Sequence, residues 1–380
     1  MSNNKKKLVV VKIGSSSVTD LKGGISSHKI KKHVSEVAKL KDEGHGVIIV
    51  TSGSIAAGFQ RLGYTERPKT VAAKQAAAAV GQGLLMEEYT KHLLQFGYIG
   101  AQILLTRSDF ADKRRYQNAY NALEVLLKRG AVPIINENDT ISIEELQFGD
   151  NDTLSAQVAG LVHADLLIML TDTDGLYTAD PRKDPNAKRI ELVEKITPEI
   201  EESAGSVGSS VGTGGMQSKI KAAKIAVMAG VPVFICSSKE QGVLVKALDG
   251  TAKGTYFKSC KTNLKTRLQW VAFHSGVKGT IYIDDGAVEA LEKRGKSLLP
   301  SGIIEVKGDF FAGDVVEVLD KDGNYIGKGI TNYDCEDLKV FKGMSSSDIY
   351  RLKSTGKVEA IHRDNWMGNL QLEKRRELNA

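Results

Sequence analysis

Short runs of apolar, mostly β-branched residues alternate with longer segments of helical spacing over the first two thirds of the chain. The first run, LVVVKI at 8–13, stops at Gly14 and three serines, which is the pattern of a buried strand ending in a tight turn. Runs that are apolar on both faces and joined by helical crossovers predict an α/β fold with a mostly parallel sheet sandwiched by helices. Strands are expected at 8–13, 47–51, 99–104, 132–136, 166–171 and 231–236, and helices at 28–43, 71–96, 114–129 and 153–162.

The pattern changes after residue 258. A polar, basic stretch at 261–267 is followed by short apolar runs separated by turns such as Asp322-Gly323, which is typical of a small barrel-like β domain. These runs are 280–285, 303–306, 315–319 and 325–330. We therefore predict an α/β domain over 1–260, a linker over 261–276, a mainly-β domain over 277–360 and a C-terminal tail over 361–380.

Composition narrows the class of protein. A length of 380 residues with 41% hydrophobic content fits about two globular domains. The excess of 52 Lys and Arg over 46 Asp and Glu is mild and is better explained by solvated charges than by nucleic-acid binding. Cys236, Cys260 and Cys335 are isolated, which argues against a disulfide framework or zinc site and favours a reducing cytoplasm. No apolar run reaches the length of a membrane span, and Lys12 interrupts the apolar stretch after the basic start, so we expect neither export nor membrane insertion.

Two lysines beside glycines indicate phosphate chemistry. Lys12 ends the first strand, and Lys219 follows the glycine-rich segment GTGGMQS at 212–218, which opens a helix. A glycine loop that leads into a helix directs backbone N–H groups and the positive end of the helix dipole at an anion, and a lysine adds a full charge. Taken singly, each lysine could be a solvated charge and each loop a plain turn. Neither segment is a Walker sequence or a GxGxxG fingerprint.

Polar residues follow several of the predicted strands. The segment GDNDTLSA places Asp150, Asn151 and Asp152 before an apolar helix, and Asp139 follows another strand. One of the three could serve as a helix N-cap, but capping does not require all of them. The segments 51–53 and 171–172 also follow strands, and parallel sheets bind ligands at this edge.

Six motifs, in this order, resemble the glutamate 5-kinases of the amino-acid kinase family: VKIGSSSV, VTSGSIAAG, INENDT, GDNDTLSA, LTDTDGLYTADPR and GTGGMQSK. The resemblance covers nearly the whole chain. Residues 286–314, with GKSLLPSGI and GDFFAGDVV, are similar to the PUA domain, an RNA-associated module that many glutamate 5-kinases carry at the C-terminus. The chain departs from the family pattern at Ser54, where alanine is common, and at Asp334-Cys335.

The resemblance implies transfer of the γ-phosphoryl group of ATP to the side-chain carboxylate of L-glutamate. A glutamate side chain has a reference pKa of ~4.3, so this nucleophile is ionised at neutral pH and needs no general base. By the same resemblance, Lys12 and Lys219 are the catalytic cations and Asp152 orients them. The residues expected to hold glutamate are Asp139, which would pair with its ammonium group, and Ser52 and Asn151, which would donate hydrogen bonds to its carboxylates. Taken by itself, Ser52 could equally be a turn residue.

The nucleotide site follows from the resemblance as well. Thr171 and Asp172 are expected on the adenine and ribose side. The phosphates are expected at Lys12, Thr213, Gly214, Gly215, Met216, Gln217, Ser218 and Lys219. Mg²⁺ is expected between phosphate oxygens, largely coordinated by water, so no protein ligand is assigned to it. The family further implies an early step of proline biosynthesis, feedback inhibition by proline, a homo-oligomer, and transfer of the product to glutamate-5-semialdehyde dehydrogenase.

Two alternatives stay open at the level of sequence. The first is a sister kinase acting on aspartate, N-acetylglutamate, carbamate or UMP, although GDNDTLSA and the absence of paired regulatory domains after residue 259 favour glutamate. The second is an RNA-binding PUA protein with a vestigial kinase domain. A pI near 8.9 permits the second alternative, but the small β domain lacks the alternation of basic and aromatic residues that single-strand readers use.

Overall fold

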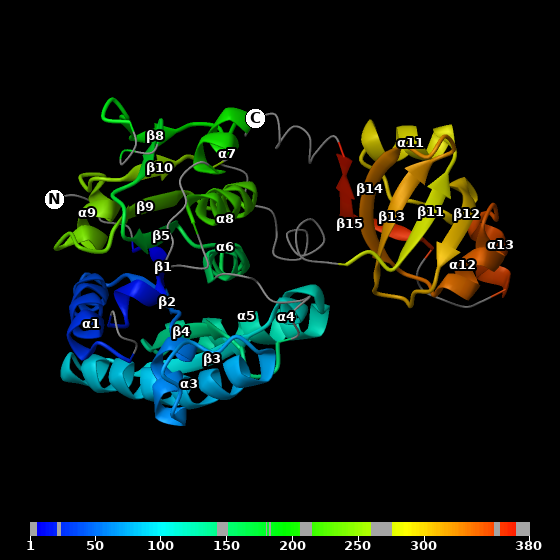
Figure 1. The fold of residues 1–380 in the computed structure, drawn as a ribbon. Coiled ribbons are helices and arrows are strands. Elements are labelled where there is room, and N and C mark those ends of the chain that lie inside the picture. The colour runs from blue at the N-terminus through cyan, green and yellow to red at the C-terminus, as the bar shows by residue number, and fades with distance from the viewer. Residues whose placement is uncertain are drawn as a thin grey trace. The chain divides into compact units, whose positions relative to one another are not determined.

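The computed structural model describes residues 6–20, 24–142, 151–179, 181, 184–205, 215–259, 276–352 and 358–369. They divide into two compact units, one holding nearly all described residues up to Ser259 and the other those from Gly276 onward (Figure 1). Of the residues predicted to bind phosphates, Thr213 and Gly214 lie outside the described residues. The same holds for Asp150, for 261–275 of the predicted linker and for 370–380 of the predicted tail.

The first unit is built on an eight-stranded sheet in the order β3-β4-β2-β1-β5-β9-β10-β8. Every neighbouring pair in it is parallel except β9 and β10. The predicted α/β sandwich is therefore confirmed. The strands of this sheet are β1 (Leu8–Ile13), β2 (Gly46–Val50), β3 (Gly100–Leu105), β4 (Val132–Glu137), β5 (Leu166–Thr171), β8 (Leu192–Val193), β9 (Val233–Ser237) and β10 (Thr255–Phe257). The short strands β6 (Leu176–Tyr177) and β7 (Arg189–Ile190) pair separately.

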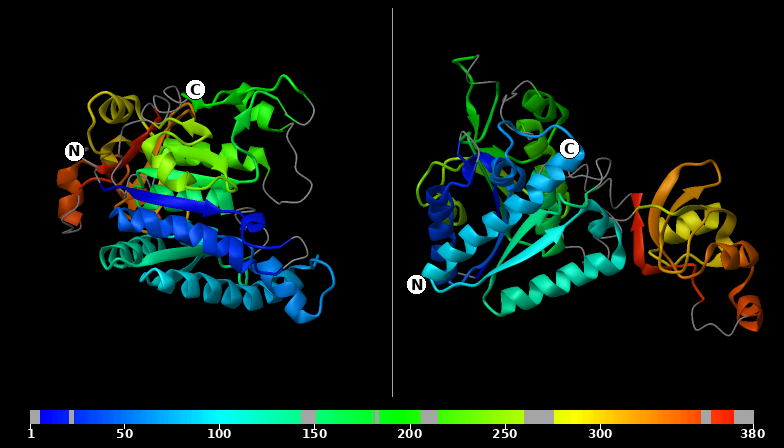
Figure 2. Two further views of the ribbon diagram at one scale, coloured as in Figure 1. Left: turned by 90° about the vertical axis from the view of Figure 1, so that its left-hand side faces the viewer. Right: turned by 60° about the horizontal axis from the view of Figure 1, so that its bottom comes forward.

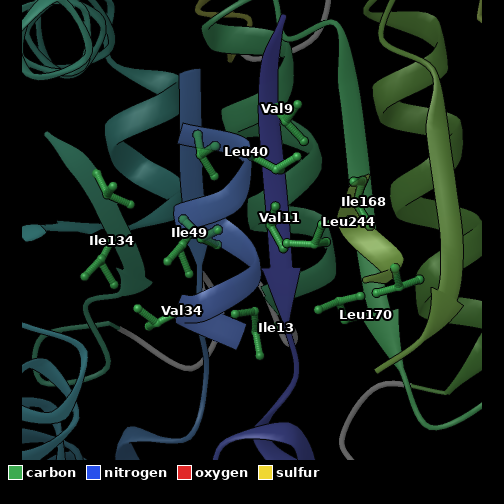
Figure 3. Close-up of a cluster of buried hydrophobic side chains, with 14 of the residues drawn as sticks. Val9, Val11, Ile13, Val34, Leu40, Ile49, Ile134, Ile168, Leu170 and Leu244 are labelled. Carbon is green, nitrogen blue, oxygen red and sulfur yellow. The ribbon is translucent and has the colours of Figure 1, made fainter. Parts of the chain in front are cut away.

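Helices pack on both faces of this sheet. They are α1 (Ser27–Asp42), α2 (Ser54–Gly58), α3 (Val71–Gln95), α4 (Arg107–Ala111), α5 (Lys113–Lys128), α6 (Asn151–Leu161), α7 (Pro198–Gly205), α8 (Met216–Met228) and α9 (Val243–Asp249), with the 3-10 turns η1 (Ser15–Ser17) and η2 (Phe59–Leu62). One face is covered by α1, α3 and α9 through a continuous apolar cluster, part of which Figure 3 shows. Figure 2 shows the same arrangement from two further directions, with α1 and α3 in contact.

The alternation of side chains along β1 decides what each face receives. Val9, Val11 and Ile13 belong to the cluster under α1 (Figure 3). Successive side chains of a strand point to opposite faces, so Val10 and Lys12 point to the other face. On that face α6 packs against β1 and β5, and α8 packs against α6. Lys12 is therefore directed from the sheet toward the start of α6.

The second unit is a five-stranded sheet in the order β12-β11-β13-β14-β15, with its own buried core. Its strands are β11 (Gly279–Ile283), β12 (Ile303–Gly308), β13 (Val315–Asp320), β14 (Tyr325–Thr331) and β15 (Ile361–Gly368), and its helical segments are α11 (Asp285–Glu292), η5 (Pro300–Gly302), α12 (Cys335–Phe341) and α13 (Ser346–Leu352). The predicted mainly-β domain is confirmed.

Two predictions for the second unit are wrong in detail. The strand expected at 280–285 ends at Ile283, because the Asp284 side chain accepts a hydrogen bond from the Ala287 amide and caps α11. Residues 361–368 of the predicted tail 361–380 form β15 instead and pair with β14. Trp366 and Met367 of this strand are buried, and Trp366 belongs to the core cluster of the unit.

Within the described part of the chain, no helix combines the length and apolarity needed to cross a bilayer.

Candidate active site

The structure brings Lys12, Asp152 and Lys219 together at the carboxyl end of β1. Asp152 lies in the first turn of α6 and Lys219 in the first turns of α8. Lys12 Nζ lies 2.5 Å from Asp152 Oδ1, and Lys219 Nζ lies 3.3 Å from Asp152 Oδ2. Each carboxylate oxygen therefore holds one ammonium group. The predicted orienting role of Asp152 has the geometry that it requires.

The charge of Asp152 is maintained by its neighbours. Its side chain is buried, and burial alone would raise its pKa. The charges of Lys12 and Lys219, with hydrogen bonds from Lys12 and Ser218, outweigh that effect and lower the pKa of Asp152 to about 2. Asp152 is therefore ionised throughout the neutral range, and the two ammonium groups keep a fixed anionic anchor between them.

Two of the three residues that could have capped α6, Asn151 and Asp152, bind other groups through their side chains. The Asp152 carboxylate faces the lysines and the Ser218 hydroxyl, which lies 2.9 Å away. Asn151 Nδ2 donates to the main-chain oxygen of Thr51 at 2.7 Å and to Asn136 Oδ1 at 2.8 Å. Neither of these two side chains is therefore the N-cap, because both are turned toward the carboxyl ends of the strands, and the third candidate, Asp150, lies outside the described residues.

The bonds of Asn151 also change its expected chemistry. Its amide group carries two hydrogens, and both are taken by Thr51 and Asn136. The Asn151 side chain therefore has no hydrogen left for a carboxylate, contrary to expectation, and what it offers a ligand is its oxygen, Oδ1.

Asp139 lies in the turn after β4 and is held from α2. Ser54 Oγ donates to Asp139 Oδ2 at 2.7 Å. Burial raises the pKa of Asp139, while the Ser54 hydrogen bond and the charge of Arg67 act in the opposite direction. Ser54 is a position at which the chain departs from the family pattern, so this departure acts on the carboxylate expected to pair with the substrate ammonium.

Ser52 lies at the carboxyl end of β2, in the turn that leads into α2. The next residue, Gly53, has a φ of 104°, in the left-handed region, and a Cβ there would lie 2.9 Å from Val18 Cγ2. Glycine at position 53 therefore lets the chain turn sharply. Ser52 is half-buried and is brought to the same sheet edge as Lys12 and Asn151.

A pH prediction follows from the environment of Asp139. Since the Ser54 hydrogen bond lowers the pKa of Asp139, Ser54→Ala should raise that pKa, and protonation of Asp139 would remove the negative charge that is expected to pair with the substrate ammonium. The Michaelis constant for an amino-acid acceptor should rise as the pH falls through the Asp139 pKa, and in the variant this rise should begin at a higher pH. Steady-state kinetics between about pH 5 and 8 measures the shift. Ser108→Ala, which removes a hydroxyl hydrogen-bonded to Thr106, is a matched control and should not move the profile. Superimposable profiles for wild type and Ser54→Ala would contradict the prediction.

The expected nucleotide side lies at the end of β5 and the start of α8. Thr171 closes β5, and its hydroxyl donates to Asp172 Oδ1 at 2.9 Å. Gly215 is the N-cap of α8, and Met216, Gln217 and Ser218 form the first turn. Ser218 Oγ lies 2.9 Å from both Gly215 O and Asp152 Oδ2, so the first turn of α8 is tied to the Asp152 carboxylate.

The turn after β1 offers further N–H groups. Its internal bonds run from the amides of Ser17, Val18 and Thr19 to Gly14 O and Ser15 O. The amides of Ser15 and Ser16 have no acceptor among the described residues. These N–H groups and the N-terminus of the 13-residue helix α8 provide an environment suited to an anion beside two ammonium groups. Among the residues that the structure describes, no group of three or more His, Cys, Asp or Glu side chains is arranged to hold a metal ion.

This fold and this site define a class of protein. Residues 7–237 match the model of the amino acid kinase family and residues 279–353 match that of the PUA domain, so the chain belongs to the amino acid kinase family. Three relatives named glutamate 5-kinase are 51% identical (Bacillus cereus strain ATCC 10987), 52% identical (Geobacillus kaustophilus) and 53% identical (Streptococcus sanguinis), each over 364 residues. The alignments cover 96% of this chain and 99%, 97% and 96% of those proteins. The chain is thus a member of the glutamate 5-kinases, and the protein is a kinase that acts on a carboxyl group.

A solved structure supports the fold alone. Carbamate kinase from Giardia lamblia bound to AMP-PNP superposes with a TM-score of 0.50 at 15% identity, covering 67% of this chain and 99% of that one.

Some residues around the site were not assigned a role from the sequence. Ser54 contacts Asp139, Asn136 contacts Asn151, and Gln82 contacts Asn136. Ser54 was marked by its departure from the family, and Asn136 by its place in INENDT. Gln82 lies within a long helix and carries no signal of its own in the sequence.

Proposed function

We propose that the protein transfers the γ-phosphoryl group of ATP to the side-chain carboxylate of L-glutamate, giving L-glutamyl 5-phosphate in the first step of proline biosynthesis. The observation that carries the proposal is the buried carboxylate of Asp152 between the ammonium groups of Lys12 and Lys219. This arrangement suits a reaction between two anions, since its difficulty is their mutual repulsion rather than the strength of the nucleophile.

The residues of the chain act on that repulsion. Phosphoryl transfer spreads charge over the oxygens of the moving group, and catalysis comes mainly from positioning and from fixed charges at that group. Lys12 and Lys219 supply the charges from two different structural elements, and Asp152 keeps their orientation constant. Because the pKa of Asp152 is about 2, it does not exchange protons during the reaction near neutral pH.

The proposed nucleotide site takes its phosphates at the turn after β1 and at the N-terminus of α8, with Thr213 and Gly214 as further expected contacts. Mg²⁺ bound to the phosphates would neutralise part of their charge. Because Mg²⁺ usually keeps several waters and takes phosphate oxygens as ligands, the proposal assigns it no protein ligand. Thr171 and Asp172, at the end of β5, would face the nucleoside.

The proposal is tested with the full chain and a panel of acceptors. ADP release and trapping of the acyl phosphate with hydroxylamine are measured with L-glutamate, L-aspartate, N-acetyl-L-glutamate, carbamate and UMP. We expect L-glutamate to give the highest kcat/KM by a wide margin. A higher value for another acceptor would assign the chain to a sister activity, and no turnover with any of them would refute the proposed function.

The role of Asp139 gives a separate prediction. Asp139→Asn removes the negative charge expected to pair with the substrate ammonium, so the KM for L-glutamate should rise about a hundredfold while the KM for ATP changes less than about threefold. Steady-state kinetics with each substrate varied in turn measures both constants. Asp112→Asn, an exposed aspartate beyond β3, is the control. Equal effects on the two constants would contradict the assignment.

Inhibition by proline is part of the proposal. The end product of the pathway would bind the free enzyme and lower its rate, and a proline titration of glutamate-dependent ADP release measures this effect. The same titration of a protein that lacks the residues beyond Cys260 measures how much the second unit contributes to the inhibition.

An acyl phosphate is short-lived in water, so the proposal includes transfer of the product to glutamate-5-semialdehyde dehydrogenase. The proposed enzyme is a homo-oligomer in the cytoplasm.

A further inference from the structure

Four side-chain amides form a continuous chain of hydrogen bonds that ends at the proposed glutamate site. They come from four elements: Gln102 from β3, Gln82 from α3, Asn136 from β4 and Asn151 from α6. Gln82 Nε2 donates to Gln102 Oε1 at 3.1 Å, and Asn136 Nδ2 donates to Gln82 Oε1 at 2.8 Å. Asn151 Nδ2 then donates to Asn136 Oδ1 at 2.8 Å.

The main chain fixes the direction of this chain of amides. Thr51 O can only accept a hydrogen bond, so the side of Asn151 that faces it must be the nitrogen. The Glu137 amide can only donate, and it donates to Asn136 Oδ1 at 3.0 Å. These two fixed groups require Asn136 to turn its nitrogen toward α3, where Gln82 must present its oxygen.

This orientation of the amides leaves the side-chain oxygen of Asn151 available as an acceptor at the active-site end. Both hydrogens of Asn151 are used, and Oδ1 receives no hydrogen bond from the described residues. Asn151 links the segment at Thr51 to the segment at Asn136. Three residues further along each of these segments, the hydrogen bond between Ser54 and Asp139 links the same two segments. The open oxygen of Asn151 and the carboxylate of Asp139 therefore lie along the same pair of segments, and both are acceptors.

We propose that Gln82 is a positioning residue that stabilises the orientation of Asn136 set by the Glu137 amide and, through it, the placement of Asn151, so that Asn151 Oδ1 and the Asp139 carboxylate present two acceptors to the α-ammonium group of the substrate. The inference rests on the proposed function and deepens it. It attributes the selection of an amino acid, over a dicarboxylate that lacks an ammonium group, to the orientation of the hydrogen-bonded amides. Asn136 is 1% exposed, so its nitrogen depends on Gln82 for a partner. Without that partner, the preference of Asn136 for this orientation weakens, and with it the placement of Asn151.

The test compares two changes at one position. Gln82→Met keeps the length of the side chain and removes the acceptor, whereas Gln82→Glu keeps an acceptor for Asn136. Gln102→Met, at the exposed end of the chain of amides, is the control. Calorimetric titration of the full chain with L-glutamate and with glutarate, which lacks the ammonium group, measures binding without requiring turnover. Turnover of the wild type with ATP is measured alongside.

We expect Gln82→Met to weaken L-glutamate binding about tenfold and glutarate binding less than about twofold. Gln82→Glu and Gln102→Met should stay within about threefold of the wild type for both ligands, and the KM for ATP should not change. Equal weakening of both ligands, no weakening by Gln82→Met, or loss with Gln82→Glu as large as with Gln82→Met would each overturn the inference. Failure of the wild type to phosphorylate L-glutamate would refute the proposed function, while the binding comparison would still decide the role of Gln82.

Discussion

Lys12→Met is expected to lower kcat about a thousandfold. The variant keeps the length of the side chain and removes one of the two ammonium groups that Asp152 holds at the carboxyl end of β1. The loss should appear in kcat, because the charge matters most while the phosphoryl group is in transfer, and a single preorganised donor is typically worth a factor of about 100 to 1,000. Steady-state ADP release at saturating ATP and L-glutamate is the measurement.

The fold should survive this change. Asp152 keeps its contacts with Lys219 and Ser218, so its buried charge is not left without partners. The temperature of thermal unfolding should therefore fall by only a few degrees. Lys128→Met removes a lysine whose side chain is 70% exposed, and it should leave both turnover and unfolding unchanged. A folded Lys12→Met protein that turns over at a near-normal rate would refute the catalytic assignment.

Gly81→Ala is expected to destabilise the protein by about 3 kcal/mol and to raise the KM for L-glutamate. A Cβ at Gly81 would lie 1.8 Å from Ser54 O and 2.6 Å from Gly58 N, so the main chains of α2 and α3 must separate to admit a methyl group. That movement carries Ser54 away from Asp139. Urea denaturation measures the first effect and steady-state kinetics the second.

The same helix offers a matched control. Gly83 lies two residues further along α3, and a Cβ added there would have no described atom within 4 Å. Gly83→Ala should therefore stabilise the protein by about 0.5 to 1 kcal/mol, because alanine is favoured over glycine inside a helix. If the two variants unfold at the same urea concentration, the close approach of α2 and α3 does not limit stability.

The central sheet could be predicted from the sequence because its strands are buried on both faces. The runs 8–13 and 166–171 were predicted with the bounds that β1 and β5 have, because β-branched and apolar residues fill them almost completely. β15 was missed for the opposite reason. Its sequence, IHRDNWMG, has polar and charged residues near its start that are partly exposed, and mainly its second half is buried. The short helices α11, α12 and α13 span only seven or eight residues each, too few for a periodic pattern to stand out.

The candidate site was predictable as a set of residue types but not as a geometry. The pairing of Asp152 with both lysines was expected from the family, and the structure supplies the distances. The donor role expected of Asn151 failed because it depends on Thr51 and Asn136, which lie far from Asn151 in the sequence. A hydrogen-bond partner of this kind is set by the packing of α6 against the sheet, and no local pattern reports it.

The contact of α2 with α3 through Gly58 and Gly81 has a consequence for protein engineering. Main chain meets main chain at this crossing, so neither glycine can be exchanged for a slightly larger residue without separating the two helices. A library aimed at new acceptors should keep both glycines constant. Sequence variation should be introduced at Ser54 and Gln75, whose side chains contact the turn that carries Asp139.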